Sequence, residues 1–214
     1  MLVKEELAQT RQNGPMLVFW KQRLVFLAVP KTGTSAWASA LAPLASMVIS
    51  DPPELKHAPL YRYNRFIRPM LDKVGAGGME TLAVVREPVD WLGSWYRYRQ
   101  RPFLDGRPES TARMTFDAFV QAYCQGDRPA FAEVGSQAKF LEPRPNGVAV
   151  NHVFAYEAQT ALIRFLESRL EMPIAVAREN ASQPATLALP DETERRLRRK
   201  FAADFDLWQA ARRQ

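Results

Sequence analysis

A short polar turn near the start of the chain combines residue types that suit anion binding. It reads Pro-Lys-Thr-Gly-Thr-Ser at 30–35 and follows a uniformly apolar run at 24–29. A turn between a buried strand and a helix directs backbone N–H groups and the positive end of the helix dipole toward one place, which suits a phosphate or sulfate. Gly33 allows close approach of the backbone, Lys31 adds a cation, and the two hydroxyl residues after Gly33 add donors. The segment predicts an anion-binding turn, with an ordinary turn and a solvated lysine as the alternative.

A second cationic residue follows another apolar run. Residues 81–85 are apolar or β-branched, Arg86 comes directly after them, and Ser94 stands eight residues later in a helical pattern. An arginine at a strand end and a serine two turns into the next helix can converge on one anion. The alternative is a surface ion pair of Arg86 with Glu87 or Asp90.

The composition points toward a negatively charged ligand. The chain has 214 residues, with 29 Lys and Arg against 23 Asp and Glu, a net charge of +6, and a pI near 9.7. This balance favours anionic partners but does not choose among nucleotides, nucleic acids and membrane surfaces. Hydrophobic residues make up 47% of the chain, which excludes disordered and collagen-like classes.

Cysteine usage and hydropathy suggest where the protein works. Cys124 is the single cysteine, so an intrachain disulfide and a thiolate-based zinc site are excluded and a reducing, cytoplasmic setting is expected. The longest uncharged run, 32–50, contains Gly33, Pro43 and several hydroxyl residues, so we expect no membrane span. Charged residues within the first dozen positions give no indication of an export signal.

The elements that would position these residues follow from periodicity. We expect an N-terminal extension at 1–15, with a short helix at 2–12, and a single domain over 16–214. Apolar runs predict strands at 16–20 and 24–29, joined as a hairpin, at 81–85 and at 148–156. Helical spacing predicts helices at 36–44, with Trp37, Leu41 and Leu44 on one buried face, and at 89–99, 115–123, 136–141 and 158–170. A last helix is predicted from Asp191 onward, with a capping box between Asp191 and Glu194. The order predicts an α/β fold of three layers, α/β/α, around a central, mainly parallel sheet.

Two motifs in this order resemble those of sulfotransferases that use 3′-phosphoadenosine 5′-phosphosulfate (PAPS). FLAVPKTGTS resembles the loop that holds the 5′-phosphosulfate, and VVREPVDWLGSWY resembles the segment that holds the 3′-phosphate. LKHAP at 55–59 and VFAYE at 153–157 resemble further segments of the family more weakly. Because Arg199-Lys200 is followed by Phe201 rather than glycine, the resemblance is closer to carbohydrate-type or bacterial members.

This resemblance implies a P-loop-like fold similar to nucleotide kinases and the transfer of a sulfuryl group from PAPS to a hydroxyl acceptor, without a metal. The acceptor would be a sugar, a phenol or a small alcohol, and the products a sulfate ester and adenosine 3′,5′-bisphosphate (PAP). The implied donor-binding residues are Lys31, Thr32, Gly33, Thr34, Ser35 and Ala36 at the 5′-phosphosulfate, Arg86 and Ser94 at the 3′-phosphate, and Tyr156 at the adenine.

The resemblance also implies catalytic roles for Lys31 and a histidine. Lys31 would stand by the bridging oxygen. A base that works near neutral pH is most often a histidine, and the resemblance places it at His57. We interpret His152 as structural and keep Asp51 and Glu54 as reserve bases.

Other interpretations stay open. Aromatic and basic residues interleave at 61–68 and 95–101, which suits an acceptor cleft or, equally, arginines that lie along helical faces. A divergent P-loop kinase is the competing enzyme, although the first glycine of the Walker A pattern is absent. A basic nucleic-acid-binding module is a third class, but no recognisable motif supports a specific nucleic-acid partner.

Overall fold

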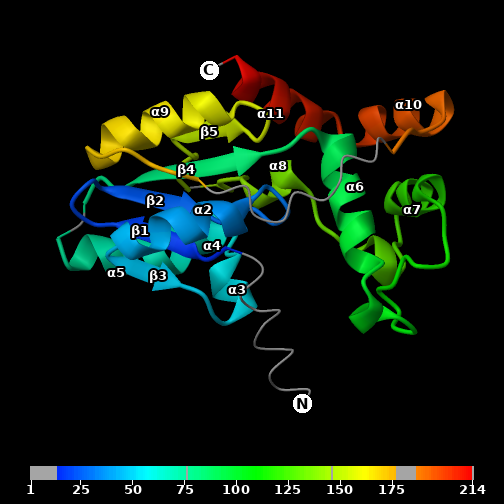
Figure 1. Ribbon diagram of the computed structural model, residues 1–214, viewed down its shortest axis with the longest axis horizontal. Helices are drawn as coiled ribbons and strands as arrows, with labels where there is room; N and C mark the ends of the chain where they lie inside the picture. The colour runs from blue at the N-terminus through cyan, green and yellow to red at the C-terminus, as the bar shows by residue number, and fades with distance from the viewer. Residues whose placement is uncertain (1–13, 76, 146, 177–186, 214) are drawn as a thin grey trace.

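The first two apolar runs form the predicted hairpin (Figure 1). In the computed structural model, which describes residues 14–75, 77–145, 147–176 and 187–213, β1 (Met16–Phe19) pairs antiparallel with β2 (Leu24–Leu27). Every residue of both strands is buried, as the uniformly apolar runs predict for strands covered on both faces. The helix predicted at 2–12 lies outside the described residues.

Five strands make up the sheet in the described part of the chain, in the order β3-β1-β2-β4-β5. The others are β3 (Met47–Ile49), β4 (Glu80–Val85) and β5 (His152–Ala155). β2, β4 and β5 are parallel neighbours, whereas β1 runs antiparallel to both β2 and β3. The sheet is therefore mixed, and the predicted parallel arrangement applies to the β2, β4 and β5 side only.

The helical segments between and after these strands have the following bounds. They are α2 (Thr34–Leu41), η1 (Ala42–Leu44), α3 (Pro53–Lys56), α4 (Leu60–Arg62), η2 (Tyr63–Ile67), α5 (Arg68–Lys73), α6 (Pro88–Arg99), η3 (Pro102–Leu104), α7 (Phe116–Tyr123), η4 (Ala130–Ala132), α8 (Gln137–Phe140), α9 (Gln159–Leu170), α10 (Asp191–Lys200) and α11 (Ala202–Arg212). The strand-turn-helix order predicted around residues 30–35 and 86 is therefore present.

Helices cover both faces of the sheet (Figure 1). Successive strand residues point to opposite faces, so Val25 and Leu27 pack with α4, η2, α5 and α11, while Leu24 and Phe26 pack with α2 and α9. The result is a three-layer α/β arrangement. None of the helices in the described ranges combines the length and the apolar character that crossing a bilayer requires.

A further group of helices lies beyond the carboxyl end of β4, where α6, α7 and α10 stand beside the sheet (Figure 1). They enclose their own apolar cluster, which includes Trp91 and Tyr96 from α6, Phe119 from α7 and Leu197 from α10. This cluster packs α6 against α7 and α10.

Three local predictions are wrong. Leu44 is exposed because Pro43 shifts the end of α2 into the short helix η1. The C-terminal helix is two helices, interrupted at Phe201, whose backbone leaves helical geometry while its side chain is buried. No capping box forms: Pro190 is the N-cap of α10 and no side chain caps it. Asp191 and Glu194 lie in the first turn, where negative charge favours the helix dipole.

Candidate anion-binding site

The turn between β2 and α2 has an unusual backbone. Lys31 has φ 66° and Gly33 has φ 78°, so two residues of a six-residue turn lie in the left-handed region. A non-glycine residue adopts this conformation at a cost and keeps it only where its surroundings determine it. Gly33 is the N-cap of α2, and no side chain caps that helix. The start of α2 therefore presents the positive end of the helix dipole beside the turn, which favours an anion there.

One side chain from α6 and one from the turn itself hold the turn in place. The indole Nε1 of Trp91 in α6 donates to the carbonyl of Pro30 at 2.8 Å. The buried hydroxyl of Thr32 donates to the carbonyl of Val29 at 2.9 Å. The hydroxyl of Thr32 therefore stabilises the turn itself, which differs from the expectation that it would hold a ligand.

Tyr156 reaches the turn from the end of β5. Its N–H donates to the carbonyl of Val85 at 2.6 Å, and its ring lies against Gly33 so closely that a Cβ there would be 2.7 Å from Cε2. The guanidinium carbon of Arg86 lies 4.5 Å from the centre of the same ring. Tyr156 thus joins the two predicted anion-binding segments.

The ends of β2 and β4 bring Lys31 and Arg86 together. Parallel neighbours present their carboxyl ends at the same edge of a sheet, where ligands of α/β proteins bind. Here the Arg86 guanidinium (Nη1) lies 3.5 Å from the backbone carbonyl oxygen of Lys31. Arg86 also makes the ion pair that the alternative interpretation named, because its Nε is 2.6 Å from the Asp90 carboxylate.

The backbone of Arg86 is held by a side chain that the sequence did not single out. The Gln137 amide accepts from the N–H of Arg86 at 2.8 Å and donates to its carbonyl at 2.9 Å. The buried carboxylate of Asp204 in turn accepts from the Ser136 hydroxyl and from the N–H groups of Gln137 and Ala138, at 2.7–3.0 Å. The sequence offers one signal for this contact, which is that Asp204 stands among the apolar residues of the last helix. An aspartate in that position predicts a buried, hydrogen-bonded carboxylate but does not predict which residues bond to it.

The Lys31 side chain lies among aromatic rings and like charges. Its Nζ is 4.2 Å from the ring centre of Tyr98 and 5.7 Å from that of Trp95, so the segment at 95–101 adjoins the turn. Burial lowers the pKa of Lys31 to about 7. Three nearby positive charges act in the same direction, those of Arg101, Arg86 and Arg97. A bound anion would reverse this effect and favour the charged lysine.

His57 lies beside the strand that leads into the turn. It is the C-cap of α3, and its Nδ1 is 2.8 Å from the carbonyl oxygen of Ala28. Because a carbonyl only accepts, Nδ1 carries the proton and Nε2 of the neutral ring can accept one. Burial lowers the pKa of His57, and the hydrogen bond to Ala28 offsets this in part. The reserve bases Asp51 and Glu54 are exposed.

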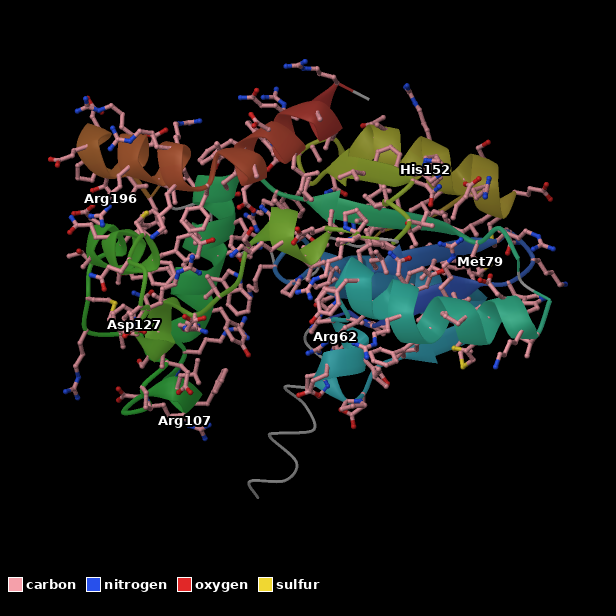
Figure 2. All side chains as sticks on the ribbon, turned by 180° about the vertical axis from the view of Figure 1, so that it is seen from behind. Arg62, Met79, Arg107, Asp127, His152 and Arg196 are labelled. Carbon is pink, nitrogen blue, oxygen red and sulfur yellow. The ribbon has the colours of Figure 1, made fainter. Side chains whose placement is uncertain are left out.

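His152 is placed at the other end of the sheet. It begins β5, and Figure 2 shows it at the same end as Met79, away from α6. Its Nε2 pairs with the Glu80 carboxylate at 2.8 Å, which also pairs with Arg169 at 2.8 Å. This location agrees with the structural interpretation of His152.

The remaining predicted residues lie on the two helices. Thr34 is buried, Ser35 and Ala36 are half-buried in the first turn of α2, and the Ala36 N–H donates to the Gly33 carbonyl at 3.1 Å. Ser94 is half-buried in α6. The segment at 61–68 forms α4 and η2, where Tyr63 and Ile67 are buried in the core.

Comparison with protein-family models, with curated proteins and with solved structures finds no match to this chain.

Proposed function

We propose that this chain transfers a sulfuryl group from PAPS to a hydroxyl acceptor. One observation carries the proposal: two anion-binding segments, the turn at 30–35 and Arg86, meet at the carboxyl ends of adjacent parallel strands. A nucleotide with both a 5′-phosphosulfate and a 3′-phosphate needs two such segments on one side of a sheet. The P-loop-like fold and the assignment of one phosphate to each segment belong to this proposal.

The residues of the turn would bind the 5′-phosphosulfate. Backbone N–H groups at the start of α2 and the Ser35 hydroxyl would stabilise the negative charge that develops on the 5′-phosphate. Lys31 would neutralise the oxygen that bridges sulfur and phosphorus as the bond between them lengthens. The backbone conformation at Lys31 and Gly33 is already set by Trp91 and Tyr156, so this arrangement needs no ordering step on binding.

His57 would accept the proton of the acceptor hydroxyl. The acceptor oxygen forms a bond to sulfur, the bond from sulfur to the bridging oxygen breaks, and that oxygen keeps the electron pair as PAP leaves. The proton of the acceptor moves to Nε2 of His57, which the hydrogen bond at Nδ1 keeps unprotonated in the neutral ring. Because the pKa of His57 is lowered, the base form persists below pH 6.5, and the acid limb of the pH profile of kcat should lie below that value.

Ligand-dependent thermal stability tests the proposal before the acceptor is known. PAP in the presence of a chelator should raise Tm, because a ligand that binds only the folded state stabilises it by about 2.7 kcal/mol at a hundred times its Kd. ATP with magnesium serves as the comparison. Stabilisation by ATP with magnesium and not by PAP would favour a kinase and overturn the proposal.

A further inference from the structure

Two arginines of the candidate site share one carboxylate. Asp90, in the first turn of α6, accepts from Nε of Arg86 at 2.6 Å and lies 3.6 Å from Nη2 of Arg97. The side chains of Arg86 and Arg97 are 16% and 21% exposed, whereas that of Asp90 is 46% exposed. The Asp90 carboxylate is therefore more exposed to solvent than the two guanidinium groups that it contacts.

The guanidinium of Arg97 lies close to the backbone of Gly93. Asp90, Ser94 and Arg97 follow one another at spacings of four and three residues along α6, so they share one helix face. A Cβ on Gly93 would be 3.3 Å from Nη1 of Arg97. Because glycine has no side chain, the guanidinium can lie close to the helix backbone and within 3.6 Å of Asp90. Nε of Arg97 is buried, and none of the residues that the structure describes forms a hydrogen bond with it.

Several positive charges lie near one another around Lys31. Arg86 and Arg97 both act on the charge state of Lys31, as does Arg101, and Asp90 pairs with two of these cations. Like charges brought this close favour an additional anion. A phosphate dianion accepts from two guanidinium groups at once, with more charge and more acceptor oxygens than one carboxylate.

We propose that Arg97 grips the 3′-phosphate together with Arg86, and that Asp90 is an internal anion which holds both guanidinium groups until the phosphate displaces it. This inference rests on the proposed function for the identity of the ligand. Because the Asp90 carboxylate is the exposed member of each pair, at 46%, water can solvate it once the phosphate takes its place between the arginines. Asp90 then sets the affinity: it keeps the arginines oriented in the empty site and competes with the phosphate.

Binding measurements on matched variants test the proposal. The probes are PAP, adenosine 3′-phosphate and adenosine 5′-phosphosulfate, of which the last lacks a 3′-phosphate. We expect Asp90→Asn to tighten PAP and adenosine 3′-phosphate by about threefold to tenfold, and Arg97→Ala to weaken both by about tenfold or more. Adenosine 5′-phosphosulfate should change by less than about twofold, which separates competition at the 3′-phosphate from a general effect of net charge.

Arg68 and Asp72 supply matched controls. They form an exposed pair four residues apart in α5, with 3.8 Å between Nε and Oδ2, so Asp72→Asn and Arg68→Ala change the same charges in another ion pair. Both should leave binding of all three probes within about twofold of the unchanged protein. Far-ultraviolet circular dichroism and Tm verify that each variant is folded.

The outcomes separate the two proposals. Equal losses of PAP and adenosine 5′-phosphosulfate in Arg97→Ala, or unchanged PAP affinity in Asp90→Asn, would overturn this inference and leave the proposed function standing. The expected shifts with adenosine 3′-phosphate, combined with failure to transfer sulfate from PAPS, would support the site and overturn the function. Absence of binding of any 3′-phosphate probe to the unchanged protein would overturn both.

Discussion

The candidate site contains two strand-turn-helix units, β2 with α2 and β4 with α6. In both, a cationic residue follows the strand, but the two helices begin differently. In the first unit, α2 begins at Gly33, an N-cap residue that has no side chain to cap the helix. In the second, Pro88 lies in the first turn of α6 and the Glu87 carboxylate accepts from the N–H of Asp90 at 2.8 Å. The start of α6 is therefore already occupied by an anion of the chain itself.

This difference shows that one sequence pattern offers an anion two kinds of site. In the proposed function, the first unit would meet the anion with the start of α2 and with the left-handed backbone at Lys31 and Gly33, where the glycine packs against Tyr156. The second unit would meet it with the guanidinium of Arg86, because the Glu87 carboxylate already caps α6. The N–H of Glu87 is itself bound to the Glu157 carboxylate at 3.0 Å. The capping residues, rather than the strand-turn-helix order, would then decide which groups meet the ligand.

Loss of Lys31 should give the largest effect, because no other residue of either unit would neutralise the bridging oxygen. Lys31→Met should lower kcat for sulfate transfer by about a hundredfold or more, as loss of one preorganised donor does in other enzymes, with only a modest loss of PAP affinity. Steady-state kinetics with PAPS and calorimetric titration with PAP measure the two quantities. A proportionate loss of both would instead make Lys31 a ground-state binding residue.

Gly33→Ala should destabilise the protein more than the same change at another left-handed glycine. Gly33 and Gly78 have φ 78° and 82°. A Cβ on Gly33 would lie 2.7 Å from Tyr156, whereas one on Gly78 would have no atom of the described residues within 4 Å. We expect a cost of about 1 kcal/mol for Gly78→Ala and about 3 kcal/mol for Gly33→Ala. Urea unfolding measures both, and equal costs would mean that Tyr156 gives way freely.

The stability of the ligand-free protein should rise when Lys31 is replaced. Since folding lowers the pKa of Lys31 from 10.5 to about 7, the charged lysine destabilises the folded state fully below pH 7. This cost declines as pH rises from 7 to 10.5, because over this range Lys31 loses its proton in the folded state while the unfolded state still holds it. Lys31→Met should therefore raise Tm most at pH 6 and least near pH 10. A gain in Tm that does not depend on pH would contradict this account.

The smallest effect concerns the cap of the second unit. Glu87→Ala removes the acceptor for the Asp90 N–H and should lower stability by about 1 kcal/mol, or about 2–4 °C in Tm for a chain of this size. Burial raises the pKa of Glu87, so its charge is itself unfavourable. Glu87→Gln keeps an acceptor without the charge and should cost less than Glu87→Ala. Equal costs for the two variants would show that the hydrogen bond is not what stabilises the start of α6.

Local sequence determined the elements that build the site. The hairpin of β1 and β2, the strand β4 and the helices α2 and α6 follow from runs of apolar residues and from helical spacing, which depend on residues near in sequence. The same reasoning placed Lys31, Gly33 and Arg86 at strand ends. It missed β3 because that strand has three residues, two of them exposed, too few to show a period.

Tertiary structure decided which groups meet at these ends. Gln137 holds the backbone of Arg86 from a position 51 residues away, and Asp204 holds the segment at Gln137 from 67 residues away. Tyr156 packs on Gly33 because β5 joins the sheet next to β4. The lowered pKa of Lys31 likewise depends on its burial and on arginines that come from another part of the sequence, Arg86, Arg97 and Arg101. Such contacts join residues far apart in sequence, so no local pattern encodes them, whereas strand and helix periods repeat within a few residues.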